Sequence, residues 1–132
     1  MSRDSLTLAF LPDRYAVCRL KRDDAVPDWA YSCGLVSITR TQEELSIVCL
    51  QDSVPPDVTC RRDWRCLKVD GPIDFAQIGV LPSLAGPLAD AGIPVFVVST
   101  YDTDYLLVPE PHATRAAEVL TDAGHRIKKL DQ

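Results

Sequence analysis

The chain has 132 residues, of which 46% are hydrophobic and 25% are charged. This composition is typical of a globular protein with one ordinary domain or two very small ones, and it excludes disordered and fibrous classes. Lys and Arg total 14 against 19 for Asp and Glu, so the net charge is -5, which argues against a nucleic-acid partner. No apolar run approaches the roughly 20 residues of a membrane span, and the first residues, MSRDSLTLAF, lack the pattern of a secretion signal. We therefore expect a cytosolic protein that has no membrane partner.

The first half of the chain contains four strand candidates, at residues 6–11, 15–20, 35–39 and 45–50. One short helical turn is expected near residues 27–31. Consecutive prolines in QDSVPPD break any regular element, so residues 52–57 are interpreted as the linker between two halves. The predicted domains are residues 1–60, a unit made mostly of strands, and residues 61–132.

The second half has stronger patterns and is predicted as strand, helix, strand, strand, helix, strand. Residues 64–69 alternate as a half-buried strand does, and residues 80–91 carry apolar side chains at helical spacing. Pro87 lies inside this helix and removes one backbone donor, so a kink or a tightened turn is expected there. Strands at residues 95–98 and 105–108 follow, then a helix beginning at Pro111 and a last strand after Gly124.

This order predicts an α+β fold of the ferredoxin-like type (βαββαβ), with both helices on one face of an antiparallel sheet. The first half is interpreted as a trimmed version of the same plan. Residues 95–98 are apolar at every position, which is typical of a strand covered on both faces. The second cover is expected from another part of this chain or from another subunit.

The turn between the two central strands of the second half is almost wholly polar, and reads STYDTD at Ser99 to Asp104. Four hydroxyls and two carboxylates are more than a simple turn requires, and their density suits a small polar ligand. Asp and Thr also close turns through their own side chains, so a purely structural turn remains an alternative. Asp102 is closer to that structural role.

Three strings of the sequence resemble a known family: SITRTQEELSIVC at residues 37–49, GPIDFAQIGVLPSLAGPLADAGI at residues 71–93, and VSTYDTDYLLV at residues 98–108. They are similar to small bacterial ACT-domain proteins of the cytosolic arginine-sensor type, which carry tandem ACT-like units. The resemblance covers most of the chain. It implies a ferredoxin-like fold and a regulatory module that binds an amino acid or a related small molecule, commonly at an interface between ACT units. It also implies a homo-oligomer, with a dimer expected, and no catalytic residues.

The resemblance implies two ligand-binding elements. The first is the loop that leads into the first helix, formed by Ile78, Gly79, Val80 and Leu81. A glycine lets the backbone approach a ligand closely, and the open N–H groups of a helix start receive a carboxylate. The second element is Ser99, Thr100, Tyr101 and Asp104, whose acid would hold the cationic end of the ligand. Ser37 and Thr39 are candidates for ligand or interface contact.

Other functions have less support in the sequence. An enzyme on the same scaffold, as in acylphosphatases, needs an anion-cradling loop with an arginine, and residues 77–81 contain none. A pure protein-interaction module stays open because an apolar sheet face also suits a protein partner. No cofactor is expected. A metal at Asp102 and Asp104 is disfavoured because no phosphate-binding loop accompanies them, and both His112 and His125 are interpreted as surface or capping residues.

The five cysteines, Cys18, Cys33, Cys49, Cys60 and Cys66, include no C-x-x-C pair. An odd count argues against a disulfide framework, and the spacings do not match a tetrahedral zinc site. Cys18 and Cys49 lie inside apolar runs, where a free thiol behaves as a small hydrophobe. Reduced, buried thiols are therefore expected.

Overall fold

The computed structural model describes residues 5–71 and 79–128. Its contacts divide the chain into two units. The first unit is Asp13–Trp64, and the second unit combines Met1–Pro12 with Arg65–Gln132. Strand β5 (Cys60–Val69) runs across the division and supplies a strand to both units. No helix among the described residues is long and apolar enough to cross a membrane.

The first unit is an antiparallel sheet with the strand order β3-β4-β2-β5. Its strands, besides the first part of β5, are β2 (Tyr15–Leu20), β3 (Ser37–Arg40) and β4 (Leu45–Leu50). Short 3-10 turns, η1 (Asp28–Ala30) and η2 (Gln51–Ser53), stand where the ferredoxin-like plan has helices. The unit thus consists mostly of strands, with short turns and no α-helix among its described residues.

Apolar side chains from one face of this sheet form the core of the first unit. The buried members are Ala16, Cys18, Ala30, Leu45, Ile47, Cys49 and Val54. Val54 lies in the segment that the sequence analysis interpreted as a linker. That interpretation is wrong, because the double proline ends η2 but leaves Val54 packed in the core of the first unit, with 7% of its surface exposed. The chain passes between units further along, inside β5.

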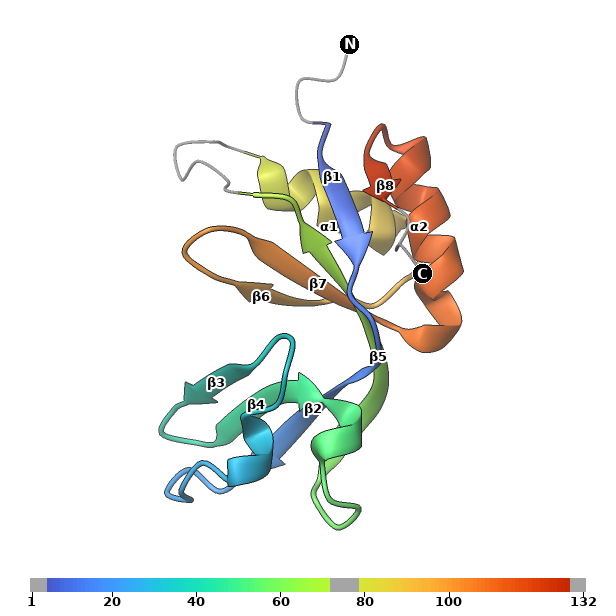
Figure 1. Ribbon diagram of the computed structural model, residues 1–132. Helices are drawn as coiled ribbons and strands as arrows, with labels where there is room; N and C mark the ends of the chain where they lie inside the picture. The colour runs from blue at the N-terminus through green and yellow to red at the C-terminus, as the bar shows by residue number, and fades with distance from the viewer. Residues whose placement is uncertain (1–4, 72–78, 129–132) are drawn as a thin grey trace. The chain divides into compact units, whose positions relative to one another are not determined.

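The second unit is a five-stranded sheet in the order β6-β7-β5-β1-β8 (Figure 1). Its remaining elements are β1 (Thr7–Phe10), α1 (Val80–Asp90), β6 (Phe96–Ser99), β7 (Asp104–Pro109), η3 (Glu110–His112), α2 (Ala113–Asp122) and β8 (Arg126–Lys128). From β5 to β8 the elements follow the βαββαβ order predicted from the sequence.

Strand β1 departs from the predicted organisation. The sequence analysis assigned residues 6–11 to the first half and divided the domains between residues 60 and 61. In the structure β1 is inserted between β5 and β8, antiparallel to β5 and parallel to β8. Leu8 stands opposite Val69 on one side and Ile127 on the other, and it is fully buried. Burial of this apolar side chain explains why the segment joins the second unit.

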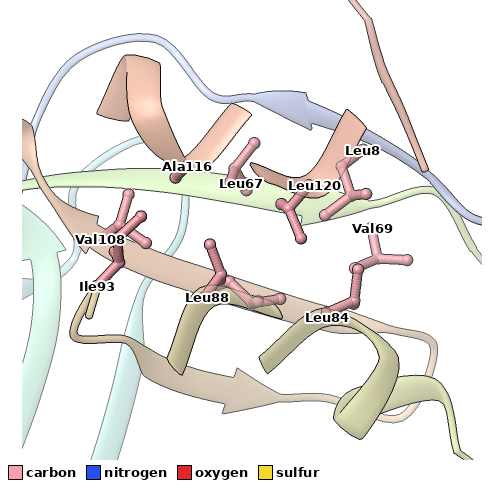
Figure 2. Packing of buried hydrophobic residues seen from close by; sticks show 10 residues of the cluster. Leu8, Leu67, Val69, Leu84, Leu88, Ile93, Val108, Ala116 and Leu120 are labelled. Carbon is pink, nitrogen blue, oxygen red and sulfur yellow. The ribbon is translucent and has the colours of Figure 1, made fainter. Parts of the chain in front are cut away.

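The core of the second unit lies between the sheet and the two helices. Figure 2 shows Leu84 and Leu88 of α1 and Ala116 and Leu120 of α2 pointing toward side chains of the sheet. The other buried members are Leu8, Leu67, Val69, Ile93, Leu106 and Val108. The helices follow the predicted spacing, and Pro87 lies inside α1 as expected.

Candidate functional site

The start of α1 leaves two backbone N–H groups without a partner inside the helix. Gly79, just before the helix, has φ of 87°, in the left-handed region where other residues are strained. A Cβ added there would meet no described atom within 4 Å. Glycine is therefore favoured at this position by its backbone conformation and not by a lack of space for a side chain. The Ser83 N–H donates to the Gly79 carbonyl at 3.0 Å, and Pro82 has no N–H. The amides of Val80 and Leu81 are the ones left for an anionic group.

The side chains at this helix start have other roles. Val80 is 7% exposed and belongs to the buried hydrophobic residues, whereas Leu81 is half-buried. Only the backbone of Val80 is therefore available to a ligand. Ile78, the fourth residue predicted for this element, lies outside the described residues.

The turn between β6 and β7 is closed by its own residues. Ser99 and Asp104 form the last pair of the two strands. The Thr100 N–H and hydroxyl both donate to the Thr103 carbonyl, at 2.8 and 3.0 Å, and the Thr100 hydroxyl accepts the Thr103 N–H at 3.3 Å. This is the structural role that the sequence left as an alternative. The cited bonds use the N–H and the hydroxyl of Thr100 within the turn and do not involve its carbonyl.

Thr103, which the sequence analysis did not select, ties the turn to the sheet. It is 5% exposed, and its hydroxyl donates to the Val69 carbonyl at 2.7 Å. Val69 is the last residue of β5. The bond therefore holds the turn against the end of the strand that leads toward α1. No sequence signal distinguished this hydroxyl from the other three in the turn.

The structure brings the two predicted elements to the same end of the sheet. Both views place the beginning of α1 and the β6–β7 turn at that end (Figures 1 and 2). Asp104 is half-buried at the start of β7, while Ser99 and Asp102 are exposed. Tyr101 is 82% exposed at the turn. A carboxylate and a helix start therefore lie at one end of the same unit.

Ser37 and Thr39 lie in the other unit. They are on β3, the edge strand of the first unit, opposite Val48 and Ser46 of β4. Both side chains point to one face of this strand; Thr39 is exposed and Ser37 is half-buried.

His125 is not a surface residue, but the capping role expected for it is confirmed, because its N–H donates to the Leu120 carbonyl at 3.0 Å at the end of α2. His125 is 6% exposed. Its Nδ1 accepts the Leu6 N–H at 3.1 Å, and its Nε2 lies 2.9 Å from the Ser83 carbonyl oxygen. His112 is half-buried just before α2. The side chain of His125 is thus part of the interior, in contact with Leu6, the residue before β1, and with the first turn of α1.

A groove in the first unit was also missed by the sequence analysis. It has a volume of about 630 Å³ and is lined by Arg19, Leu20, Lys21, Arg22, Asp24, Glu43, Val58 and Thr59. The guanidinium of Arg22 donates to the Gln42 carbonyl at 3.1 Å, and that of Arg19 to the Glu43 carbonyl at 3.4 Å. These arginines connect the end of β2 to the β3–β4 turn. The basic run RLKR at residues 19–22 is the sequence signal that would have indicated this groove.

The cysteines of the described residues are free thiols. Cys18 and Cys49, which lie in apolar runs, are buried as expected, and so is Cys66, whereas Cys60 is half-buried and Cys33 is exposed. A hydrogen bond with Cys49 and burial raise the pKa of Cys18, and burial raises the pKa of Cys66 to about 12. Among the described residues no group of three or more His, Cys, Asp or Glu is placed to hold a metal ion.

Comparison with known families identifies the class of domain. The family model of the ACT domain matches residues 59–122, and a separate family model of an N-terminal domain matches residues 13–57. The first match covers the βαββα part of the second unit. Residues 59–122 therefore belong to the ACT-domain family.

Curated relatives carry the name cytosolic arginine sensor for mTORC1 subunit 1. The protein of that name from Bos taurus is 30% identical over 124 residues, which cover 89% of this chain and 36% of the relative. The chain thus spans about a third of that relative's length.

Solved structures support the fold. A crystal structure of a protein from Agobacterium tumefaciens is 42% identical, covers 97% of this chain and 96% of that one, and superposes with a TM-score of 0.92. The ligand-free regulatory subunit of aspartate kinase from Thermus thermophilus is 11% identical, covers 88% and 96% of the two chains, and has a TM-score of 0.61. The second likeness shows a shared fold alone.

Proposed function

We propose that this chain is a non-catalytic regulatory module that senses an amino acid. The ligand binds at the end of the second unit's sheet, between the start of α1 and the β6–β7 turn. The observation that carries the proposal is that the start of α1, at Val80 and Leu81, and the β6–β7 turn, which ends at Asp104, lie at the same end of one sheet (Figure 1). An amino acid presents one anionic and one cationic group, and these two elements complement them.

L-Arginine is the first candidate ligand. Its guanidinium suits the carboxylate of Asp104, because such pairs form strong charge-assisted hydrogen bonds. The name of the curated relatives, arginine sensor, supports the same choice. In this arrangement the α-carboxylate receives the amides of Val80 and Leu81, and the exposed Tyr101 ring lies over the ligand.

The role of the predicted turn residues is divided in this proposal. Asp104 contacts the ligand through its side chain, while Thr100 contributes its carbonyl, because its N–H and hydroxyl are used within the turn. Ser99 is exposed and adds a hydrogen bond through its hydroxyl. Asp102, exposed on the turn, makes no contact with the ligand.

Calorimetric titration with L-arginine tests the proposal, with agmatine and L-citrulline as paired probes. Agmatine lacks the carboxylate and should lose the contact with the helix start, whereas citrulline has a neutral ureido group in place of the guanidinium and should lose the charged contact with Asp104. Asp104→Asn should weaken L-arginine binding by roughly 10- to 100-fold, since hydrogen bonds to charged groups contribute about 1.5–3 kcal/mol. It should also reduce the preference for arginine over citrulline.

Asp102→Asn is the matched control, because it removes the same charge two residues away. Its affinity for L-arginine should stay within about twofold of the wild type, since a contact through a distant surface charge is weak. Equal losses in the two variants would contradict the assignment of Asp104. If the folded wild type bound neither L-arginine nor another standard amino acid, the sensor function itself would be rejected.

The module is proposed to act as a homodimer. Strand β6 pairs with β7 alone among the described strands, and its Phe96, Val97 and Val98 are partly exposed. An edge strand with apolar side chains favours association with a second copy. Sedimentation velocity should find a dimer, and Val98→Lys on β6 should shift it to a monomer. A wild type that stays monomeric at all concentrations would contradict this part of the proposal.

A further inference from the structure

The first observation is that His125 is hydrogen-bonded through both ring nitrogens inside the second unit. The residue is 6% exposed, and its Nδ1 accepts the backbone N–H of Leu6 at 3.1 Å. Because an acceptor nitrogen carries no proton, the proton of the neutral ring is on Nε2. Nε2–H then donates to the Ser83 carbonyl at 2.9 Å. One imidazole therefore joins the chain before β1 to helix α1.

The second observation is that the Ser83 carbonyl has lost its donor inside the helix. In an α-helix, the carbonyl of residue 83 accepts the N–H of residue 87. Residue 87 is Pro87, which lies inside α1 and has no N–H. The bond at the Ser83 carbonyl is partly buried, and a fully buried carbonyl without a donor costs about 1–3 kcal/mol. His125 Nε2 stands at hydrogen-bond distance from this carbonyl.

We propose that His125 supplies the hydrogen bond that Pro87 removes from α1, and that it thereby positions the first turn of α1 for the ligand. The second clause rests on the proposed function. His125 is a positioning residue, because it touches Ser83 and not the ligand.

Ser83 transmits this position to the start of the helix. Its hydroxyl donates to the Val80 carbonyl at 2.6 Å, and its N–H donates to the Gly79 carbonyl at 3.0 Å. The residue held by His125 thus bonds two of the residues whose backbone faces the proposed ligand. Loss of the His125 contact leaves the Ser83 carbonyl unpaired and lets the first turn rotate, so the Val80 and Leu81 amides no longer point together at a carboxylate.

The contact on the other ring nitrogen fixes where the histidine stands. The Leu6 carbonyl accepts the Arg126 N–H at 2.8 Å, and the Ser5 hydroxyl donates to the Gly124 carbonyl at 2.7 Å. The His125 N–H donates to the Leu120 carbonyl at 3.0 Å, at the end of α2. Backbone contacts before β1 and at the end of α2 therefore fix the position of the His125 ring, which a residue that orients α1 requires.

The first test is the protonation state of the ring and a double-mutant cycle. Imidazole ¹⁵N NMR of the full chain should show His125 as the neutral tautomer with the proton on Nε2. His125→Phe should raise the unfolding equilibrium constant at least about tenfold, as expected for lost buried hydrogen bonds. Pro87→Ala restores an N–H at position 87. In that background His125→Phe should cost several-fold less, and the difference measures the contact.

The second test separates positioning from stability. Titration with L-arginine, at a temperature where every variant is folded, should show about fivefold weaker binding in His125→Phe, consistent with the loss of about 1 kcal/mol of preorganisation. The double variant His125→Phe/Pro87→Ala should return to within about twofold of the wild type. His125→Gln, which keeps an amide donor, should lie in between. His112→Phe is the matched control, and should bind as the wild type does.

The proposal that His125 replaces the missing N–H of residue 87 would be contradicted by a proton on Nδ1. Strictly additive effects of His125→Phe and Pro87→Ala would contradict it as well. Unchanged affinity in His125→Phe, with the wild type binding, would overturn the positioning role and leave a structural one. If the wild type binds neither L-arginine nor another amino acid, the proposed function fails and the positioning role fails with it. The tautomer and the unfolding cycle still decide the replacement of the donor in that case.

Discussion

Thr103 shows how a single hydroxyl fixes the geometry of the candidate site. Its bond to the Val69 carbonyl is buried and 2.7 Å long. Thr103→Val keeps the shape of the side chain but leaves that carbonyl without a donor. We expect a loss of about 1–2 kcal/mol in the free energy of unfolding, measured by urea denaturation. Thr103→Ser retains a hydroxyl and should lose less; an equal loss would attribute the effect to packing.

Substitutions of Gly79 test whether the left-handed backbone at the start of α1 requires a glycine. Because φ is 87° and a Cβ would meet open space, the cost of a side chain is conformational and not steric. Gly79→Ala should destabilise the fold by about 1–2 kcal/mol. Gly79→Asn should cost less, since asparagine tolerates this region, and the β-branched Gly79→Val should cost more. Thermal unfolding ranks the three variants, and a ranking by side-chain volume alone would contradict this explanation.

The buried thiol of Cys66 should make the folded protein less stable at alkaline pH. Burial raises its pKa from the ordinary value of 9.0 to about 12. Between these values the unfolded chain releases the thiol proton and the folded chain keeps it, so the free energy of unfolding falls as pH rises. The contribution is fully present below pH 9. Urea denaturation of the wild type and of Cys66→Ala across this range should show a steeper decline in the wild type, and parallel curves would refute it.

At the scale of elements, β1 is the strand that completes the second unit. Leu8 is fully buried and packs with the core that Figure 2 shows. Leu8→Ala should therefore destabilise the protein by about 2–5 kcal/mol, as large-to-small changes in cores do. Lys68→Ala, on the neighbouring strand but exposed, is the control and should change the free energy of unfolding little. A small effect of Leu8→Ala would show that β1 is dispensable.

Some elements could be predicted from local sequence patterns, whereas others are determined by contacts between distant parts of the chain. Helix α1 and the strands β2, β4 and β7 were predicted from spacing and residue type, which act over a few residues. The place of β1 was not predictable, because its pairing with β8 joins residues more than a hundred positions apart. The true division inside β5 was hidden as well, since a double proline at residues 55 and 56 is a stronger local signal than a continuous strand.

The same reasoning separates the parts of the candidate site. Gly79 and Asp104 were selected because a glycine before a helix and an acid at a strand end have recognisable patterns. Thr103 and His125 were missed, because their contacts, to Val69 and Ser83, are made in three dimensions. The loss of a backbone donor at Pro87 was predicted, but no local pattern indicated that the His125 side chain would replace it.

At the scale of the whole molecule, we expect the shared strand β5 to make the two units unfold together. Both tryptophans, Trp29 and Trp64, belong to the first unit. Leu88→Ala alters only the core of the second unit. If the continuous strand makes unfolding cooperative, tryptophan fluorescence in urea should still report a lower free energy of unfolding for this variant, by about 2–5 kcal/mol. Leu45→Ala, in the first unit, is the positive control, and a fluorescence transition untouched by Leu88→Ala would mean independent unfolding.

The inserted strand β1 also determines the order in which the molecule can assemble. The bond from Leu6 to His125 spans 119 residues, whereas the β3–β4 hairpin joins strands only a few residues apart. Contacts of such separation form late, because loop closure opposes them until the intervening chain is organised. Refolding of the second unit therefore waits for its last strand, and until β8 is in place the edge of β1 that β8 will occupy stays open to unwanted pairing with other chains.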